Sequence, residues 1–179
     1  MSQTTSWTLD PVHSDITFSI RHLGISTVRG HLKAASGSAS FDTTDPNSLN
    51  LNVEIDANTL STGNDQRDEH VKSADFLDTA KFPTITFSVT GVESHGPEAQ
   101  KITGDLTLKG VTKPVVLEVE GPSAETTDPY GNVKIGASAT TVINRKDFGI
   151  SFHGVLDSGA LLLGEDIKVA LDVQFTKQA

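Results

Sequence analysis

LNLNVEIDAN, residues 49–58, is the stretch that decides the fold, because apolar and polar side chains alternate along its whole length. The apolar set is Leu49, Leu51, Val53, Ile55 and Ala57, and the residues between them are asparagine, glutamate or aspartate. Successive side chains of a β-strand point to opposite faces, so a period of two indicates a strand with one buried face. The stretch therefore predicts a sheet with one apolar and one solvated side.

The same alternation recurs on both sides of this stretch. It is found in residues 16–20, 28–34, 85–89, 102–108, 115–119, 133–139 and 167–175. About eight strands at near-regular spacing, joined mostly by hairpin-length connections, predict an antiparallel all-β sandwich or up-and-down barrel. Several strands keep the pattern for roughly ten residues, or about 33 Å, which favours a tall barrel. A closed eight-stranded barrel has no exposed edges and can hold one small ligand.

Residues 59–87 interrupt the strands and contain the one convincing helix signal. Asn64 or Asp65 can cap an N-terminus, and Val71, Ala74 and Leu77 then recur at three-residue spacing. Pro83 forces the preceding residue toward an extended conformation, so a helix must end before it. The sequence predicts a short helical insert between two strands.

The bulk composition restricts the class of protein. The 179 residues show no break in composition, so we expect one domain spanning residues 1–179. A formal charge of −9 opposes binding to nucleic acid or to anionic membranes. There is no run of roughly 20 apolar residues, and no signal-like segment at the N-terminus, so we expect no integral membrane segment and a cytoplasmic location. The absence of cysteine excludes disulfides and thiolate catalysis.

Motifs for catalysis or metal binding are weak. No serine lies in a G-x-S-x-G elbow, and no phosphate-binding glycine loop is present. His13, His22 and His31 are nine residues apart, but the strand phase puts His22 and His31 on opposite faces, so we expect no metal site. The polar cluster 67–72 could supply an acid or base, although pairing of Asp68 with Lys72 on the helix explains it more simply. We expect a protein that is not an enzyme.

Two features leave alternatives open. The small residues Gly30, Gly104, Ala137 and Ala139 fall on inward-facing positions, where they either leave room for a ligand or relieve crowding at a bend. The apolar run 161–163 lies between glycines and is either a buried strand or part of an apolar portal.

Four blocks of the chain resemble the YceI-like family of lipocalin-like polyisoprenoid-binding proteins. They are WTLDPVHSDITFSIRHLGISTVRG (7–30), RDEHVKSADFLDTAKFPTITF (67–87), ITGDLTLKGVTKPVVLEV (102–119) and INRKDFGI (143–150), and they occur in family order over nearly the whole chain. The resemblance implies an extended eight-stranded antiparallel barrel with a short helical insert. It also implies that the lumen binds a long-chain amphiphile, such as an isoprenoid quinone or polyprenyl phosphate, or a fatty-acid-like molecule.

The resemblance implies neither a catalytic constellation nor a cofactor, beyond an isoprenoid lipid or fatty-acid-like molecule that could copurify. It makes a homodimer possible, and many members of the family are periplasmic, in contrast to the location expected above. The expected partner is a hydrophobic small molecule that is carried or stored. The alternative function is a stress-related protein-interaction module whose barrel serves only as a scaffold.

The residues expected to form the site fall into two groups. We expect Phe76, Leu77 and Phe82 to close one end of the barrel as a lid. Arg67, His70 and Arg145 are candidates for donating to a polar head group, although Arg145 could instead pair with a neighbouring carboxylate. The side chains expected to line the lumen are Ile16, Phe18, Ile20, Ile55, Phe76, Leu77, Phe82, Phe87, Leu106, Leu108, Ile143 and Phe148.

Overall fold

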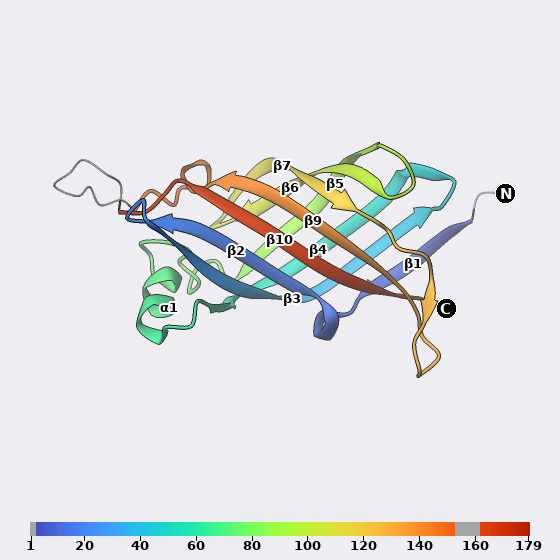
Figure 1. Ribbon diagram of the computed structural model, residues 1–179, viewed down its shortest axis with the longest axis horizontal. Coiled ribbons are helices and arrows are strands. Elements are labelled where there is room, and N and C mark those ends of the chain that lie inside the picture. Colours follow the sequence, from blue (N-terminus) through green and yellow to red (C-terminus); the bar gives the residue numbers. More distant parts are fainter. Residues whose placement is uncertain (1–2, 153–161) are drawn as a thin grey trace.

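The protein is a closed antiparallel β-barrel in a computed structural model, which describes residues 3–152 and 162–179 (Figure 1). One short α-helix interrupts the strands. The elements are β1 (Thr4–Leu9), η1 (Pro11–His13), β2 (Asp15–His22), β3 (Ser26–Asp42), β4 (Asp45–Ser61), α1 (Asp65–Lys72), β5 (Thr84–Ser94), β6 (Ala99–Leu108), β7 (Val111–Glu120), β8 (Thr126–Thr127), β9 (Val133–Asn144), η2 (Arg145–Phe148) and β10 (Asp166–Lys177).

The barrel closes where β9 pairs with β10, and β1 and β2 share one place in its wall. Both pair with β10 on one side and with β3 on the other. β1 pairs with β10 through residues 7–9 and with β3 through residues 4–8, and β2 pairs further along the same two strands. The remaining strands follow in the order β3, β4, β5, β6, β7, β9 and β10, and every pairing is antiparallel. The predicted eight-stranded antiparallel barrel is confirmed.

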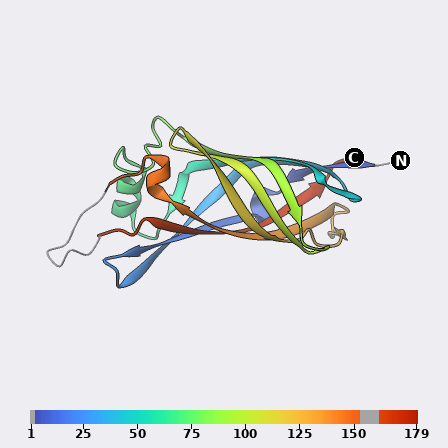
Figure 2. The ribbon, with the colours of Figure 1, turned by 90° about the horizontal axis from the view of Figure 1, so that it is seen from above.

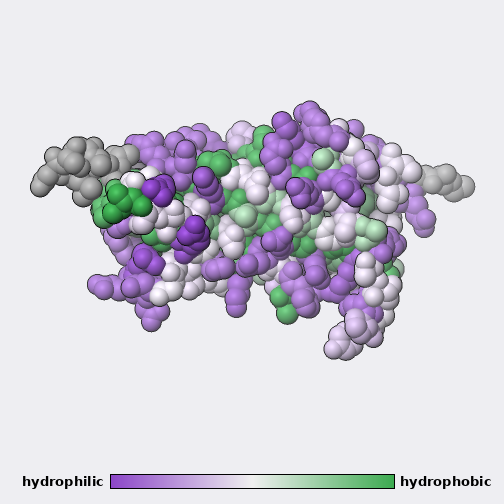
Figure 3. Space-filling view, in the orientation of Figure 1, coloured by the Kyte–Doolittle hydropathy of each residue, from purple (hydrophilic) through white to green (hydrophobic). Residues whose placement is uncertain are grey.

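The barrel is long and has two different ends. The strands β3 and β4 each run for 17 residues. Helix α1 lies at one end of the barrel, and both termini lie at the other (Figures 1 and 2). The outer face seen in Figure 3 is largely polar, with apolar residues in small groups between polar ones. The helix end, called the mouth below, and the terminal end thus have different surroundings.

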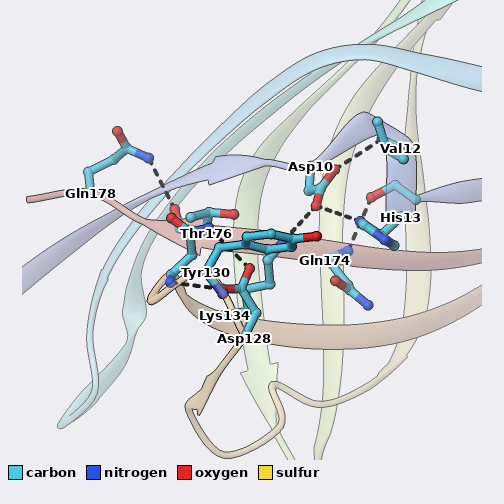
Figure 4. Close-up of polar contacts among 11 residues, drawn as sticks. Asp10, Val12, His13, Asp128, Tyr130, Lys134, Gln174, Thr176 and Gln178 are labelled. Atoms are coloured by element: carbon cyan, nitrogen blue, oxygen red, sulfur yellow. Dashed lines mark hydrogen bonds and ion pairs between the residues drawn. The ribbon is translucent and has the colours of Figure 1, made fainter.

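The break between β1 and β2 is held by a polar cluster (Figure 4). The Asp10 carboxylate caps η1 by accepting from the Val12 amide, and it also contacts the His13 ring at 2.8 Å and Lys134 Nζ at 2.5 Å. Hydrogen bonds from Lys134, and then from His13, hold the pKa of Asp10 well below its usual range. This cluster joins the broken strand to β9, which is distant in sequence.

Two of the small inward residues accommodate aromatic rings. A Cβ on Gly30 would lie 2.3 Å from Cζ of Phe18, and a Cβ on Gly104 would lie 2.3 Å from Cζ of Phe87. At these two positions the missing side chain makes room for a neighbouring ring, which lies over the glycine. Gly30 and Gly104 therefore relieve crowding in the barrel and do not leave open space for a ligand.

The helical insert begins where the sequence predicts. The side chain of Asn64 accepts from the amide of Arg67 and is the N-cap of α1. The helix ends at Lys72, earlier than the apolar spacing suggested, because Ser73 is extended and its hydroxyl donates to the carbonyl of His70. Leu77 lies in the turns that follow the helix, and it is buried against the barrel core.

Candidate ligand-binding cavity

The barrel encloses an apolar cavity of about 460 Å³. This volume lies within the usual range of sites for small molecules. The cavity is lined by Leu9, Ile16, Phe18, Ile20, His22, Val28, Leu32, Ala34, Leu51, Val53, Ile55, Leu60, Thr62, Arg67, His70, Val71, Phe76, Leu77, Ile85, Phe87, Leu106, Leu108, Val115, Leu117, Thr141, Ile143, Arg145, Ile150, Phe152, Leu162, Leu163, Ile167, Val169, Leu171, Val173 and Phe175.

The cavity is long and narrow because it follows the strands. On β10 alone its wall extends from Ile167 to Phe175, at every second residue. At strand rise this is about 26 Å along the strand, or about 20 Å along the barrel axis once the usual tilt of barrel strands is included. Leu9 and Phe175 lie at its inner end, in the core cluster that also contains Trp7. An elongated apolar tail has a matching shape.

Ten of the twelve side chains expected in the lumen line this cavity, and two do not. Phe82 lies outside it, with its ring packed over Gly110 in the turn between β6 and β7. Phe148 is only 2% exposed, but it lies in η2 and fills the core behind the cavity wall. The expected lid therefore retains Phe76 and Leu77 at the cavity, and loses Phe82.

Arg67 lines the mouth of the cavity and is held by Thr62. Its Nε donates to Thr62 Oγ1 and its Nη2 donates to the Thr62 carbonyl, both at 2.8 Å. The buried carboxylate of Asp68 in turn accepts from the amide and the hydroxyl of Thr62. Asp68 thus anchors the helix to the end of β4, which differs from the expected pairing with Lys72.

His70 belongs to a group of three rings at the same mouth. Its ring lies edge-on to Phe76 at 5.0 Å and to Phe152 at 5.3 Å, and the two phenylalanine rings are 4.9 Å apart. His70 Nε2 contacts the Asp75 carboxylate at 2.9 Å. The three rings all line the cavity, so they form an aromatic cap over the apolar lumen with one polar edge.

Arg145 also lines the cavity, but its guanidinium donates its hydrogen bonds to backbone carbonyls. The side chain is 1% exposed, and it donates to the carbonyls of Gly164, Ile150 and Phe152 at 2.8, 2.8 and 2.5 Å. Burial lowers the pKa of Arg145, and the charge of Glu165 opposes this change. Carbonyl oxygens, rather than the carboxylate named as the alternative partner, thus accept from Arg145, and Arg145 holds the rim segments together. A contact with a ligand head group stays a prediction.

The other polar groups give no metal centre. His22 lines the cavity, whereas His31 contacts Asp15 on the exposed side, so the two histidines face different sides as the strand phase predicted. In the part of the chain that the structure describes, no three histidine or carboxylate side chains converge to hold a metal ion. Of the apolar run 161–163, Leu162 and Leu163 line the cavity, and Leu161 lies outside the described residues.

Sequence reasoning missed one polar group in the middle of the wall. The hydroxyl of Thr141 on β9 donates to the carbonyl of Val116 on β7 at 2.8 Å, and Thr141 lines the cavity. Its position could have been found, because Thr141 shares the inward phase of Ile135, Ala139 and Ile143. No sequence signal identifies its partner.

Comparisons with known proteins agree with this architecture. The model of the YceI-like domain family matches residues 7–175. A UPF0312 protein of Pseudomonas savastanoi is 42% identical over 142 residues, which are 79% of this chain and 73% of the relative. Protein YceI of Salmonella arizonae is 42% identical over 139 residues, which are 78% and 72% of the two chains.

Solved structures show the same barrel. The Campylobacter jejuni YCEI protein aligns with a TM-score of 0.71 at 30% identity, covering 89% of this chain and 90% of its own. At 17% and 16% identity, Burkholderia cenocepacia BcnA (TM-score 0.77, 93% and 98% covered) and a polyisoprenoid binding domain from Saccharophagus degradans (0.66, 96% and 98%) share the fold. Among the described residues, no helix has the length and apolar character that crossing a bilayer requires. On the family match and these relatives, the chain belongs to the YceI-like domain family.

Proposed function

We propose that this protein binds a long-chain amphiphilic lipid in the barrel lumen and carries or stores it. An isoprenoid lipid, either a polyprenyl phosphate or an isoprenoid quinone, is the preferred ligand, and a fatty-acid-like molecule is the alternative. The observation that carries the proposal is the elongated cavity, whose wall is aliphatic and aromatic except near the mouth and at Thr141. The polyisoprenoid binding domain with the same fold supports this choice of ligand class.

The energetics favour a ligand that is apolar along its length. Each buried CH₂ group contributes about 0.8 kcal/mol, so twenty buried carbons contribute about 16 kcal/mol. This gross gain exceeds most estimates of the cost of association, which run from about 4 to 15 kcal/mol. The tail supplies the affinity, and the polar end needs only a few donors near the mouth, where Arg67 and His70 lie.

We propose binding without catalysis. The polar cluster on α1 has structural partners, since Asp68 accepts from Thr62 and His70 contacts Asp75. Arg67 is held by Thr62 as well, with its guanidinium at the rim of the cavity. These contacts fix the positions of groups that can donate to a head group, and they explain the cluster without a reaction.

A pair of substitutions on one strand tests the lumen as the binding site. Leu171 lines the cavity, whereas its neighbour Ala170 is exposed on the outer face of β10. The variant Leu171→Trp should weaken binding of a polyprenyl phosphate and of a long-chain fatty acid by about tenfold or more, because the indole fills part of the narrow lumen. Ala170→Trp adds the same side chain outside and should leave the affinity within about twofold. Equal affinities for both variants would contradict binding in the lumen.

A further inference from the structure

The wall of the barrel has a seam that is paired over only a short length, between β7 and β9. Among the described residues this ladder has only three residue pairs, from Glu118↔Thr140 to Glu120↔Ser138. The neighbouring ladders β6–β7 and β9–β10 run along nearly the whole length of their strands. In Figure 1, β9 lies beside β7 near the arrowhead of β7. The unpaired part of the seam extends from there toward the mouth.

The sequence of β7 limits its hydrogen bonding toward β9. Lys109 and Gly110 both have positive φ in a two-residue turn, which makes Leu108 and Val111 a hydrogen-bonded pair of the β6–β7 hairpin. Because the pattern alternates, the backbone groups of Pro114 and Val116 point away from β6, toward β9. Proline has no N–H to donate, so β7 offers β9 no ladder bond from the Pro114 nitrogen, which lies four residues beyond the last pair at Glu118.

A side chain replaces the missing backbone bonds at this place. The hydroxyl of Thr141 donates to the carbonyl of Val116 at 2.8 Å, from one strand of the seam to the other. The register of the three pairs, continued by two residues, puts Val116 opposite Val142. The seam is therefore bridged just beyond its last residue pair by one neutral side-chain hydrogen bond.

Apolar side chains lie on both surfaces of the seam. On the outside, Val116 is 47% exposed and Val142 is 57% exposed, and they are two of the few large apolar side chains at the surface. On the inside, Val115, Leu117 and Ile143 line the cavity. An apolar tail passing between the two strands would contact apolar side chains along the way. Before it reached the paired region, it would displace the hydrogen bond from Thr141 to Val116.

We propose that the β7–β9 seam is a lateral portal through which the apolar tail of the ligand enters and leaves the lumen. This inference rests on the proposed function and adds the route to it. The other route, through the mouth, is covered by the aromatic cap of His70, Phe76 and Phe152. With a lateral portal, the cap and the head-group donors stay in place while the tail exchanges.

A disulfide across the seam tests the portal, and the absence of native cysteine makes the experiment clean. The variant Val116→Cys with Val142→Cys is oxidised, the bond is verified by mass, and loading and release of a fluorescent long-chain fatty acid are followed by stopped flow. Oxidation should slow both rates at least tenfold, leave the equilibrium affinity within twofold, and be reversed by reductant. The control is Ser19→Cys with Arg29→Cys, a pair in the complete β2–β3 ladder, whose rates should not respond to oxidation.

A second pair of variants covers the case in which the disulfide fails to form. Thr141→Val keeps the shape but removes the hydroxyl, so exchange should become about fivefold faster, the equivalent of one neutral hydrogen bond. Thr141→Ser restores the donor and should restore the rates to near those of the wild type. Unchanged rates in the oxidised seam variant, or in Thr141→Val, would overturn the portal while binding itself persists. Absence of any binding by the wild-type protein would overturn the proposed function, and the portal with it.

Discussion

Replacing Arg145 by methionine distinguishes a structural role of this buried side chain from a role in binding the head group of the ligand. Methionine has a similar length but no donor, so the carbonyls of Gly164, Ile150 and Phe152 lose three short bonds from a guanidinium that is 1% exposed. Hydrogen bonds to charged groups contribute about 1.5–3 kcal/mol each, and removal of the cost of burying the charge offsets part of the loss. We expect a net destabilisation of about 3–5 kcal/mol, because three carbonyl oxygens lose a partner at about 1–3 kcal/mol each and removal of the buried charge offsets part of this.

Urea unfolding of the lipid-free protein measures this change without a contribution from bound ligand. The corresponding decrease in the melting temperature is about 6–20 °C, from about 2–4 °C per kcal/mol for a chain of this size. The control is Lys146→Met, since Lys146 forms an exposed ion pair with Glu165 that contributes less than about 1 kcal/mol. A stability within about 1 kcal/mol of the wild type, together with a large loss of ligand affinity, would refute the structural role and make Arg145 a head-group contact.

Two further substitutions test the fold. Hydrogen bonds from Lys134 and His13 lower the pKa of Asp10 in the folded state, so this carboxylate stabilises the protein above its unfolded-state pKa near 4. The contribution is lost as the pH falls further. In a pH series of urea unfolding midpoints, Asp10→Asn should therefore show a weaker decrease at acid pH than the wild type, and an unchanged profile would contradict this. Gly30→Ala should destabilise the protein by about 1–3 kcal/mol, because the new Cβ would lie 2.3 Å from the ring of Phe18. The loss measured by thermal melting should be much smaller in a Phe18→Leu background, and an equal loss in both backgrounds would show that the ring is not the obstacle.

The barrel could be predicted from the sequence because its signal is local and periodic. In a closed barrel every second residue of each strand faces the lumen, so the alternation in residues 49–58 gives both the strand and its inner face. The same rule correctly placed Ile16, Phe87 and Ile143 at the cavity. The same rule places His22 and His31 on opposite faces of the wall, where the structure has them.

The parts that sequence reasoning missed depend on irregular backbone or on contacts between distant segments. Phe82 follows the helical insert, and only the conformation of the β6–β7 turn at Gly110 decides where its ring lies. Phe148 is buried, as its apolar character suggests, but the 3-10 turn directs it behind the wall. The partners of Arg145 are backbone carbonyls in segments without a periodic pattern. Every residue has a carbonyl, so the residue types do not show which ones accept from Arg145. The shared place of β1 and β2 in the wall likewise follows from pairing with β3 and β10, far away in the sequence.

The most direct test of the central claim is to identify what the protein carries. The wild-type chain and Leu171→Trp are purified in parallel without detergent and extracted with organic solvent. Mass spectrometry then gives the amount of lipid in each extract per amount of folded protein. The account predicts a long-chain lipid with a polar end in the wild-type extract, approaching one molecule per chain, and a strongly reduced amount in the variant. Two well-folded proteins without lipid, which also fail to take up a polyprenyl phosphate or a fatty acid when these are supplied, would contradict it.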